Sequence, residues 1–497
     1  MRSQRTTSQR PGARRSKEAL LALLLLVAVA AALAWCVEML DVPPRVLASY
    51  LEQRATGHGA AVRAAGEYFG ALLVWLDPPE GPRGRRPELR IGAQAAGAEP
   101  ITAIDASQGR LVLVASAPDA LRAIEQAQPG DVITFAPGTY RFSGPGISVN
   151  RLGTAASGIM VRAERPGTVL LEFDIGEGFA VSVPYWTFEN LNIRGVCAAH
   201  SDCEHAFHVI AGAAHFVARN NTVTDFNAHF KINGMDGDFP DDGLIEGNTL
   251  NNTSVRETDS SVTPIDLVAA SRWRVRNNWI SDFAKGWGDR VSYGAFAKGG
   301  GTGNSFERNI VQCEQRLRGV PGQRVGLSLG GGSTGKQYCR DARCVTEQDG
   351  SSALSNLILS CSDDGIYVNR SATSQVRHNT LLDTGGISVR FVESSADVEG
   401  NLVDGAIRGR DGAALHAVDN QQTSMTRQYL GSHPVRDLYR DLARFDLSWV
   451  GSPPRRKRAE AAAPDLCGAQ RPSQPAYGAF EDFASCAVQV PAGQPAK

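Results

Sequence analysis

Four short phrases in the middle of the chain share one pattern, in which a glycine is followed by alternating apolar and polar residues. They occupy positions 294–298, 326–330, 365–369 and 386–390. Successive side chains of a β-strand point to opposite faces, so the second and fourth residues of each phrase are expected in a core. The third and fifth residues are then expected to face solvent, where they can meet a ligand.

Stacking these phrases, with three upstream segments in the same register, places the outward residues in two columns. The first contains His208, Lys231, Asp266, Phe296, Ser328, Tyr367 and Ser388, and the second contains Asn233, Lys298, Gly330, Asn369 and Arg390. Neighbouring coils lie ~4.8 Å apart, so Asp266, Phe296 and Lys298 are expected within one sugar's length. The strip predicts a binding site for an extended anionic glycan, with substrate-binding residues Phe296, Tyr367, Asn369, His208 and Asn233.

The strip's cationic side chains, Lys231, Lys298 and Arg390, suit an enzyme that acts on an acidic polysaccharide.

Two other functions compete with this interpretation. A non-catalytic glycan-binding or envelope-scaffold protein would use the same strip. A glycoside hydrolase would use Asp363 and Asp364 as paired catalytic carboxylates, although two aspartates before a glycine are also typical of a turn.

Two motifs of unrelated chemistry carry no prediction. Residues 330–336 are similar to a phosphate-binding loop, but Gln337 stands where a serine or threonine is needed, so no nucleotide partner is predicted. Cys203, His205 and His208 form a short Cys/His cluster, but no second pair occurs at zinc spacing. A disulfide explains that cysteine better, and no metal-ligating residue is predicted.

The elements that must position the strip are indicated by a second repeated phrase, an asparagine two residues before an aliphatic residue. The copies begin at Asn221, Asn248, Asn278, Asn309, Asn356, Asn379 and Asn401. Successive copies are therefore 27, 30, 31, 47, 23 and 22 residues apart. Repeats of this length indicate stacked units that bury their apolar faces on each other. Strand-forming residues between turns predict an all-β parallel solenoid of ~10–12 coils, with stacked asparagines at one turn.

The start of this region predicts a cap. Residues 117–127 read as a short amphipathic helix, followed by Pro-Gly-Asp at 129–131 and Pro-Gly-Thr-Tyr at 137–140. An open solenoid end would expose strand edges and core, so a capping helix is required. This opening closely resembles the N-terminal cap of right-handed, single-stranded parallel β-helix proteins of the pectate-lyase-like superfamily. The resemblance extends over about residues 108–410, and the tail at 465–481 is similar to their closing segment.

Within that superfamily the chain is most similar to the chondroitinase-B-like and alginate lyases, polysaccharide lyase family six. The resemblance implies that Lys298, before a glycine-rich turn, is the catalytic base, and that calcium and an arginine neutralise the uronate. The chain departs from the family at three positions: Val291 and Tyr293 replace acidic calcium ligands, and Gly330 replaces the arginine. Calcium therefore lacks its usual ligands, and Arg390, two coils beyond Gly330, would have to replace the arginine. The resemblance thus implies β-elimination of a uronate, which needs a base of lowered pKa and a cation at the carboxylate. We expect Lys298 as the base, Arg390 or Lys231 as the cation, and Asp266 to orient a lysine or to bind a cation.

The N-terminus predicts a membrane anchor. Residues 1–18 contain six basic residues and one acid, and an uncharged apolar run covers 19–37. That length is close to the ~20 residues that cross a bilayer, and the basic flank is expected to stay cytoplasmic. We predict a bacterial-type inner-membrane protein of single-pass topology, with its remainder in the periplasm or outside the cell. Cleavage after 32–34, which would release a secreted protein, is the alternative.

Five regions are predicted: a basic tail at 1–18, a signal anchor at 19–40, a membrane-proximal spacer at 41–107 with helix from 46 to 76, a β-helix domain at 108–425, and an extension at 426–497. The formal net charge of −1 gives no basic surface for nucleic acid. Nine cysteines are present, and Cys36 falls in the apolar run. The other eight are expected to form disulfides, with the close pairs Cys197/Cys203, Cys339/Cys344 and Cys467/Cys486 each closing a loop.

Overall fold

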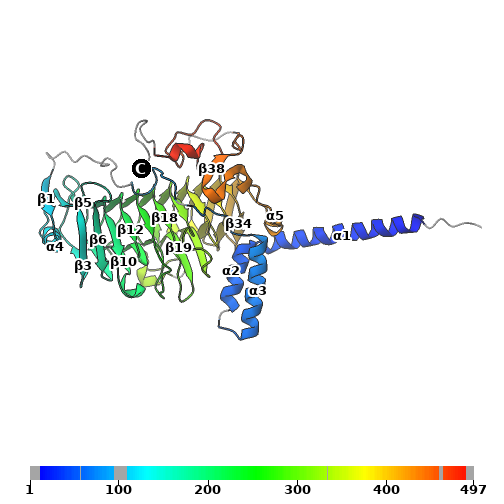
Figure 1. Cartoon of the computed structure of the whole chain (residues 1–497), viewed down its shortest axis with the longest axis horizontal. Helices are drawn as coiled ribbons and strands as arrows, with labels where there is room; N and C mark the ends of the chain where they lie inside the picture. Colours follow the sequence, from blue (N-terminus) through cyan, green and yellow to red (C-terminus); the bar gives the residue numbers. More distant parts are fainter. Residues whose placement is uncertain are drawn as a thin grey trace, which may run out of the picture.

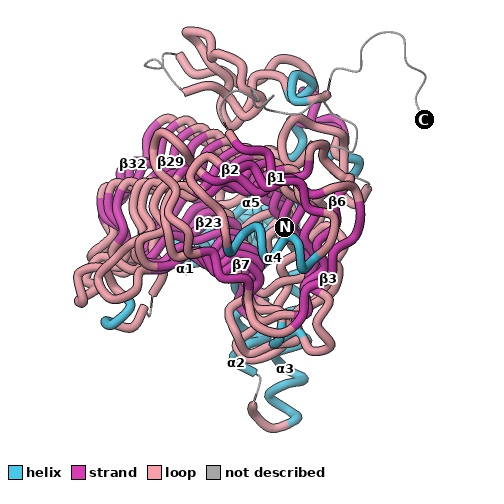
Figure 2. Tube along the Cα trace, turned by 90° about the vertical axis from the view of Figure 1, so that its left-hand side faces the viewer, coloured by secondary structure: helices cyan, strands magenta, loops and turns pink. Residues whose placement is uncertain are grey.

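The structure is a computed structural model that describes residues 12–55, 57–84, 86–94, 109–332, 334–457 and 463–488. Most of the chain winds into a right-handed parallel β-helix, as predicted. Figure 1 shows the coils stacked along the long axis, and Figure 2 looks along the stack. Each full coil contributes one strand to each of three parallel sheets, which contain 12, 10 and 11 strands. These numbers agree with the predicted number of coils.

We call the three sheets I, II and III, in the order of their strand numbers above. Sheet I contains β1 (Arg110–Val114), β2 (Asp131–Phe135), β5 (Ile159–Ala163), β8 (Trp186–Glu189), β11 (Val217–Arg219), β14 (Leu244–Glu246), β17 (Arg274–Arg276), β21 (Ser305–Glu307), β25 (Ser352–Leu354), β29 (Ser374–Arg377), β32 (Ser395–Glu399) and β35 (Ala414–Val418). Sheet II contains β4 (Ile147–Val149), β7 (Glu177–Val181), β10 (His205–Ile210), β13 (Ala228–Asn233), β16 (Ile265–Val268), β19 (Val291–Lys298), β23 (Gln323–Leu329), β27 (Ile366–Asn369), β31 (Gly386–Arg390) and β34 (Ala406–Arg410). Sheet III contains β3 (Gly138–Ser143), β6 (Val169–Asp174), β9 (Asn192–Gly195), β12 (Thr222–Thr224), β15 (Thr249–Asn251), β18 (Trp279–Ser281), β22 (Ile310–Gln312), β26 (Leu357–Leu359), β30 (Thr380–Leu382), β33 (Leu402–Val403) and β36 (Gln421–Gln422).

The repeated asparagines form a continuous ladder at the turn between sheets I and III. The side-chain amide of Asn221 donates to the side-chain oxygen of Asn248 at 3.0 Å, and Asn248 donates to Asn278 in the same way. The Asn248 side-chain oxygen also accepts from the backbone amide of Asn221, at 2.9 Å. Asn420 extends the ladder by one further coil, at 2.9 Å from Asn401. Each buried turn therefore satisfies its polar groups through the neighbouring coil.

The interior of the coils is apolar, and its N-terminal end is closed by α4 (Ala117–Glu125). This helix begins where predicted, with the Ser116 hydroxyl accepting from the backbone amide of Asp119. Ala120 and Ile124 are buried against the first coil. An N-cap serine followed by proline and an acidic residue in the first turn is a strong helix start, so the local sequence alone specifies this cap.

Within the residues that the structure describes, three helices precede the solenoid. The first, α1 (Gly12–Leu40), contains one segment long and apolar enough to cross a membrane, Leu20–Glu38, with a mean hydropathy of 2.9. The expected helix from 46 to 76 is two helices instead, α2 (Pro44–Ala55) and α3 (Ala60–Leu76), which pack as a hairpin. Two glycines near the break, Gly57 with a φ of +89° and Gly59, disfavour a continuous helix there.

The hairpin is fixed to the last coils of the solenoid and to the C-terminal segment by buried charges. Arg45 of α2 donates to Asp77 at 2.7 Å and lies 2.9 Å from Asp383 of the solenoid. Arg436, in the C-terminal segment, pairs with Asp404 and lies 3.0 Å from Asp77. Segments from both ends of the sequence and from the solenoid therefore meet in one ionic cluster.

The C-terminal segment includes α5 (Met425–Tyr429), β37 (Tyr439–Asp441) and β38 (Asp446–Trp449). It covers the outer face of sheet III, where Leu447, Phe480 and Phe483 pack with Trp279 and Leu357 of the coils. This second apolar cluster lies outside the solenoid, so the last 60 or so described residues are part of the folded body.

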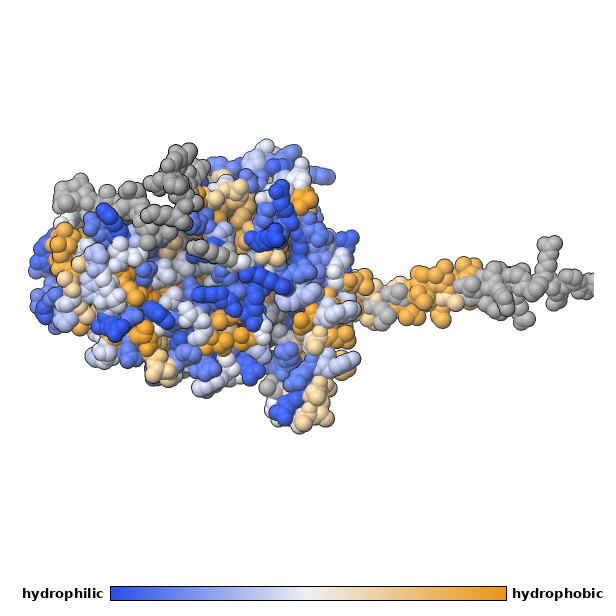
Figure 3. Space-filling view, viewed as in Figure 1, coloured by the Kyte–Doolittle hydropathy of each residue, from blue (hydrophilic) through white to orange (hydrophobic). Residues whose placement is uncertain are grey.

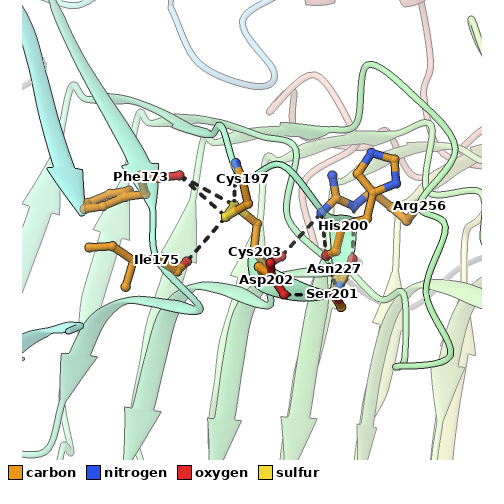
Figure 4. The surroundings of a disulfide bond; sticks show 9 residues. All are labelled: Phe173, Ile175, Cys197, His200, Ser201, Asp202, Cys203, Asn227 and Arg256. Carbon is orange, nitrogen blue, oxygen red and sulfur yellow. Dashed lines mark hydrogen bonds between the residues drawn. A yellow bond between two sulfur atoms is a disulfide. The ribbon is translucent and has the colours of Figure 1, made fainter. Parts of the chain in front are cut away.

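All eight cysteines outside α1 form disulfides. The three predicted pairs are confirmed, and the fourth is Cys313–Cys361, whose partners lie on neighbouring coils. Cys36 is free. Around Cys197–Cys203, the guanidinium of Arg256 binds the side chain of Asn227 and the carbonyl of Cys203 (Figure 4). This pair is therefore structural, as expected.

Candidate functional site

The two columns predicted from the sequence lie on sheet II in the predicted register. Lys231 pairs with Asp266, Asp266 with Phe296, and Phe296 with Ser328. The apolar residues between them are fully buried in the core, as expected: Ala295, Ala297, Leu327, Leu329, Ile366, Val368, Ile387 and Val389.

The columns are not the solvent-exposed strip that the sequence analysis expects. Asp266 and Phe296 are each 4% exposed and Asn369 is 6% exposed. Among the described residues, two elements cover the sheet: a loop at 331–347, in which position 333 is not described, over its middle, and α2 over its C-terminal end. The loop follows β23 directly, whereas α2 lies far upstream in the sequence. Strand alternation alone predicts neither cover.

The loop at 331–347 is held firmly in place. The Cys339–Cys344 disulfide closes its tip. Arg340 donates to Asp241 at 2.7 Å, and its guanidinium lies 4.3 Å from the centre of the Phe239 ring. At the base of the loop, Glu347 accepts from the Thr334 hydroxyl at 2.7 Å. The loop thus forms a wall beside the second column.

Between this wall and the sheet lies a pocket of ≈ 380 Å³, which we call the lysine pocket. Its lining brings together two predicted catalytic residues and one predicted substrate-binding residue. The lining residues are Lys231, Asn233, Gly234, Val268, Lys298, Thr334, Gly335 and Tyr338. A pocket of this volume is the size of one or two sugar units, whereas the predicted strip would be a long exposed groove.

Lys298 lies in this pocket in an unusual setting. Its ammonium sits 4.3 Å from the centre of the Phe296 ring, and within the described residues no hydrogen bond or ion pair to it is found. Burial lowers the pKa of Lys298 from its ordinary value; the Asp266 charge acts against this shift, and the Lys231 charge adds to it. A partly desolvated lysine beside another cation is a candidate general base.

Lys231 is held by a carboxylate instead. Its ammonium lies 2.9 Å from Asp266, whose second oxygen is buried with no hydrogen-bond partner among the described residues. Asn233 contacts the His208 ring at 2.9 Å, and the other ring nitrogen of His208 lies 3.0 Å from Glu177. The lysine pocket therefore contains one paired ammonium and one unpaired ammonium.

Arg390 lies elsewhere. Asn369, and not Lys298, is its partner on the adjacent coil, so three coils separate Arg390 from Lys298 in the second column. At ~4.8 Å per coil this is about 14 Å, too far for both groups to act on one sugar. Arg390 pairs with Asp411 and stacks on Phe391.

Arg390 and Tyr367 instead line a second cleft of ≈ 580 Å³ beneath α2. Asp363 and Asp364 lie in the same cleft, so they are not simply a surface turn. Burial, followed by the neighbouring Asp364 charge, raises the pKa of Asp363 to about 7. Arg408 pairs with Asp364. Helix α2 covers this cleft and so contributes to the burial that raises the pKa of Asp363. The Asp-Asp-Gly sequence gives no sign of that cover.

The calcium site implied by the family resemblance does not fit this chain. Val291 and Tyr293, at the positions of the acidic ligands, line the second cleft with an aliphatic side chain and a phenol. Within the residues that the structure describes, no group of three or more His, Cys, Asp or Glu side chains could hold a metal ion. Tyr293 packs edge-on against Phe296 at 5.5 Å, so aromatic packing takes the place of ligands.

Comparisons with known proteins give matches among solved structures only. No family model matches, and no curated protein sequence matches. A pectate lyase, Pel9A, has a TM-score of 0.46 at 16% identity, covering 73% of this chain and 90% of its own. An alginate lyase from Paenibacillus sp. str. FPU-7 has 0.34 at 15%, covering 63% and 99%. A mannuronic-acid-specific family 6 lyase from human gut microbiota has 0.37 at 13%, covering 65% and 84%. All three identities are below 25% and all three TM-scores are below 0.5, so the function is argued from the site alone.

Proposed function

We propose that this protein is a lyase-like enzyme that acts on an acidic, uronate-containing polysaccharide in the lysine pocket. The observation that supports it most is that one pocket holds two lysines in different environments. Lys298 has no hydrogen bond or ion pair within the described structure, and Lys231 forms an ion pair with Asp266. The proposed base on β19 and the proposed carboxylate-neutralising cation on β13 thus lie on either side of β16, which carries Asp266.

The chemistry follows from this division. Neutral Lys298 removes the proton on the carbon beside the uronate carboxylate, and negative charge grows on that carboxylate. We assign the stabilisation of the growing charge to Lys231, whose ammonium lies 2.9 Å from Asp266. The bond from the adjacent carbon to the leaving oxygen then breaks, a carbon–carbon double bond forms, and the departing oxygen takes a proton from water. Asn233 and the Tyr338 ring are positioned to contact the sugar.

Two predicted substrate-binding residues belong to the second cleft or its border rather than to this pocket. Tyr367 lines the second cleft, and Asn369 lies on the strand between the two sites. We propose that they bind sugar units further along the chain. The hydrolase alternative keeps one supporting observation, the raised pKa of Asp363 in that cleft.

The membrane anchor is part of the proposal. The apolar segment Leu20–Glu38 and four disulfides favour a single-pass protein with its β-helix in an oxidising compartment outside the cytoplasm.

The deciding experiment incubates the full chain in detergent with alginate, chondroitin and pectate separately. Elimination gives unsaturated uronate ends that absorb in the ultraviolet, whereas hydrolysis gives new reducing ends without this absorbance. Ultraviolet product from one glycan supports the lyase. Reducing ends alone would favour the Asp363/Asp364 hydrolase, and binding without either product would favour a scaffold.

A further inference from the structure

Helix α3 exposes an unusual amount of apolar surface. Trp75 is 75% exposed and Tyr68 69%, and Val62, Phe69 and Leu72 are also exposed. Its only charged residues are Arg63 and Glu67. Scattered apolar residues on a protein surface need no explanation, but a helix that is apolar on most sides indicates a surface that something covers.

The exposure follows from how α3 packs on α2. Within the helix only Gly66 and Gly70 are buried. A Cβ on Gly66 would lie 2.5 Å from the Cβ of Ala55, so the two backbones approach closely along this small-residue stripe. The helix turns 100° per residue, which places Tyr68 and Trp75 on the side opposite the stripe. The two most exposed aromatic rings therefore point away from the hairpin contact.

The position of α1 indicates what covers this face. Only residues 41–43 separate α1 from α2, and three residues reach about 10 Å at most. Figure 1 shows α1 leaving the C-terminal end of the solenoid roughly along its long axis, with α2 and α3 running across that direction. Figure 3 shows apolar surface on the side of the hairpin toward which α1 extends.

The angle between α1 and the hairpin is held by contacts. Glu38 of α1 accepts from the backbone amide of Thr426 at 2.9 Å, and the Tyr429 hydroxyl donates to the Val42 carbonyl at 3.0 Å. The Arg45–Asp77 pair joins this same end of α2 to the residue that follows α3. If α1 crosses a bilayer, α3 must then lie nearly parallel to the membrane plane and close to it.

We propose that α3 is an interfacial helix that lies in the headgroup region of the bilayer crossed by α1. Trp and Tyr favour this region, where apolar rings are buried and polar atoms stay wet. The inference rests on the membrane anchor of the proposed function. It also sets the orientation of the enzyme: the solenoid stands on its C-terminal end and α4 points away from the membrane. The lysine pocket, whose last strand is β19, lies four coils, or about 20 Å, from β34, the last strand of sheet II.

Site-directed fluorescence quenching tests this placement in the full chain. The protein is reconstituted in phosphatidylcholine nanodiscs that contain lipids with a quencher near the headgroup. One sample carries an environment-sensitive dye on native Cys36 and reports on α1. Two others, in a Cys36→Ser background, carry it on Ala71→Cys in α3 or on Ala156→Cys, an exposed site near the far end of the solenoid.

We expect the dye at position 71 to lose about half of its fluorescence or more, and the dye at 156 to lose none. Tyr68→Ser with Trp75→Ser should abolish the loss at 71 and leave that at Cys36 unchanged, with an unaltered melting temperature. Quenching at Cys36 without quenching at 71 would overturn the interfacial helix while the anchor stands. Absence of quenching at both would overturn the anchor together with the inference.

Discussion

Two lysines in one pocket illustrate how environment assigns roles to identical side chains. Lys231 forms an ion pair with Asp266 at 2.9 Å, whereas Lys298 faces an aromatic ring and has a lowered pKa. Burial is the main cause of the lowered pKa of Lys298, and the Lys231 charge adds to it. Base and cation are thus produced by one arrangement.

The first prediction follows for Lys298. Lys298→Ala should lower product formation at least about 100-fold, which is the usual contribution of a general base, while glycan binding changes little. In the parent, activity should rise with pH and level off below the ordinary lysine pKa of 10.5, because only the neutral amine acts. Initial rates across pH measure both effects. Lys336→Ala, on the nearby loop, is the control, and an equal loss in that variant would contradict the assignment.

A second prediction at this scale concerns Asp363 and stability. Its pKa of about 7 in the fold exceeds the ordinary 3.8, so between these pH values the folded state holds a proton that the unfolded chain has lost. The contribution of this group to stability therefore falls as pH rises through that window. Asp363→Asn removes the effect, and we expect it to melt a few degrees above the parent at pH 8 and level with it below pH 4.

Thermal melts at several pH values make this measurement. Asp238→Asn, which changes an exposed carboxylate, is the matched control and should give the same difference at every pH. A melting difference for Asp363→Asn that stays constant with pH would show that Asp363 titrates normally.

At the scale of elements, the sequence predicts the repeating strands of the solenoid but not the loop and the helix that cover sheet II. The glycine phrases set the register of Lys231, Asp266 and Phe296, because strand alternation leaves one choice. Burial of those same residues depends on the loop at 331–347 and on α2, which reach sheet II through tertiary contacts such as Arg340 with Asp241. The periodicity of the strands does not encode such contacts. The sequence therefore predicts one open strip where the structure has two covered clefts.

The covering loop gives the third prediction. Replacing Cys339 and Cys344 by serine should loosen the wall of the lysine pocket, hydrate Lys298 and move its pKa back toward the ordinary value. We expect weaker glycan binding and a pH–rate profile displaced to higher pH. The same replacement at Cys467 and Cys486 is the control: it lowers the melting temperature but leaves binding unchanged. Indistinguishable binding in the two variants would show that the loop is not part of the site.

At the scale of the whole molecule, one buried ionic cluster joins three distant parts of the chain. Arg45 comes from the N-terminal hairpin, Asp383 and Asp404 come from the last coils, and Arg436 comes from the C-terminal segment. All four are nearly inaccessible to solvent. The asparagine ladder predicts the solenoid from sequence alone, whereas these single, widely separated charges show no pattern before the chain is folded.

The last prediction concerns this cluster. Arg45→Met keeps the volume of the side chain but leaves Asp77 and Asp383 short of a cation, and breaking a buried pair costs about 3–5 kcal/mol of unfolding free energy. We expect a lower melting temperature and faster tryptic cleavage after Arg54 and Arg63, because the hairpin loses its main attachment.

The companion Asp77→Asn tests the electrostatic cause of that loss. In the Arg45→Met background it removes one of the carboxylates that have lost the Arg45 charge, so part of the stability should return, which simple loss of packing would not allow. Glu67→Gln, an exposed charge of α3, should change neither quantity. If Arg45→Met melted like the parent and kept its hairpin protected from trypsin, the hairpin would be held by other contacts. Its angle to α1, and with it the upright orientation of the solenoid, would then need another cause.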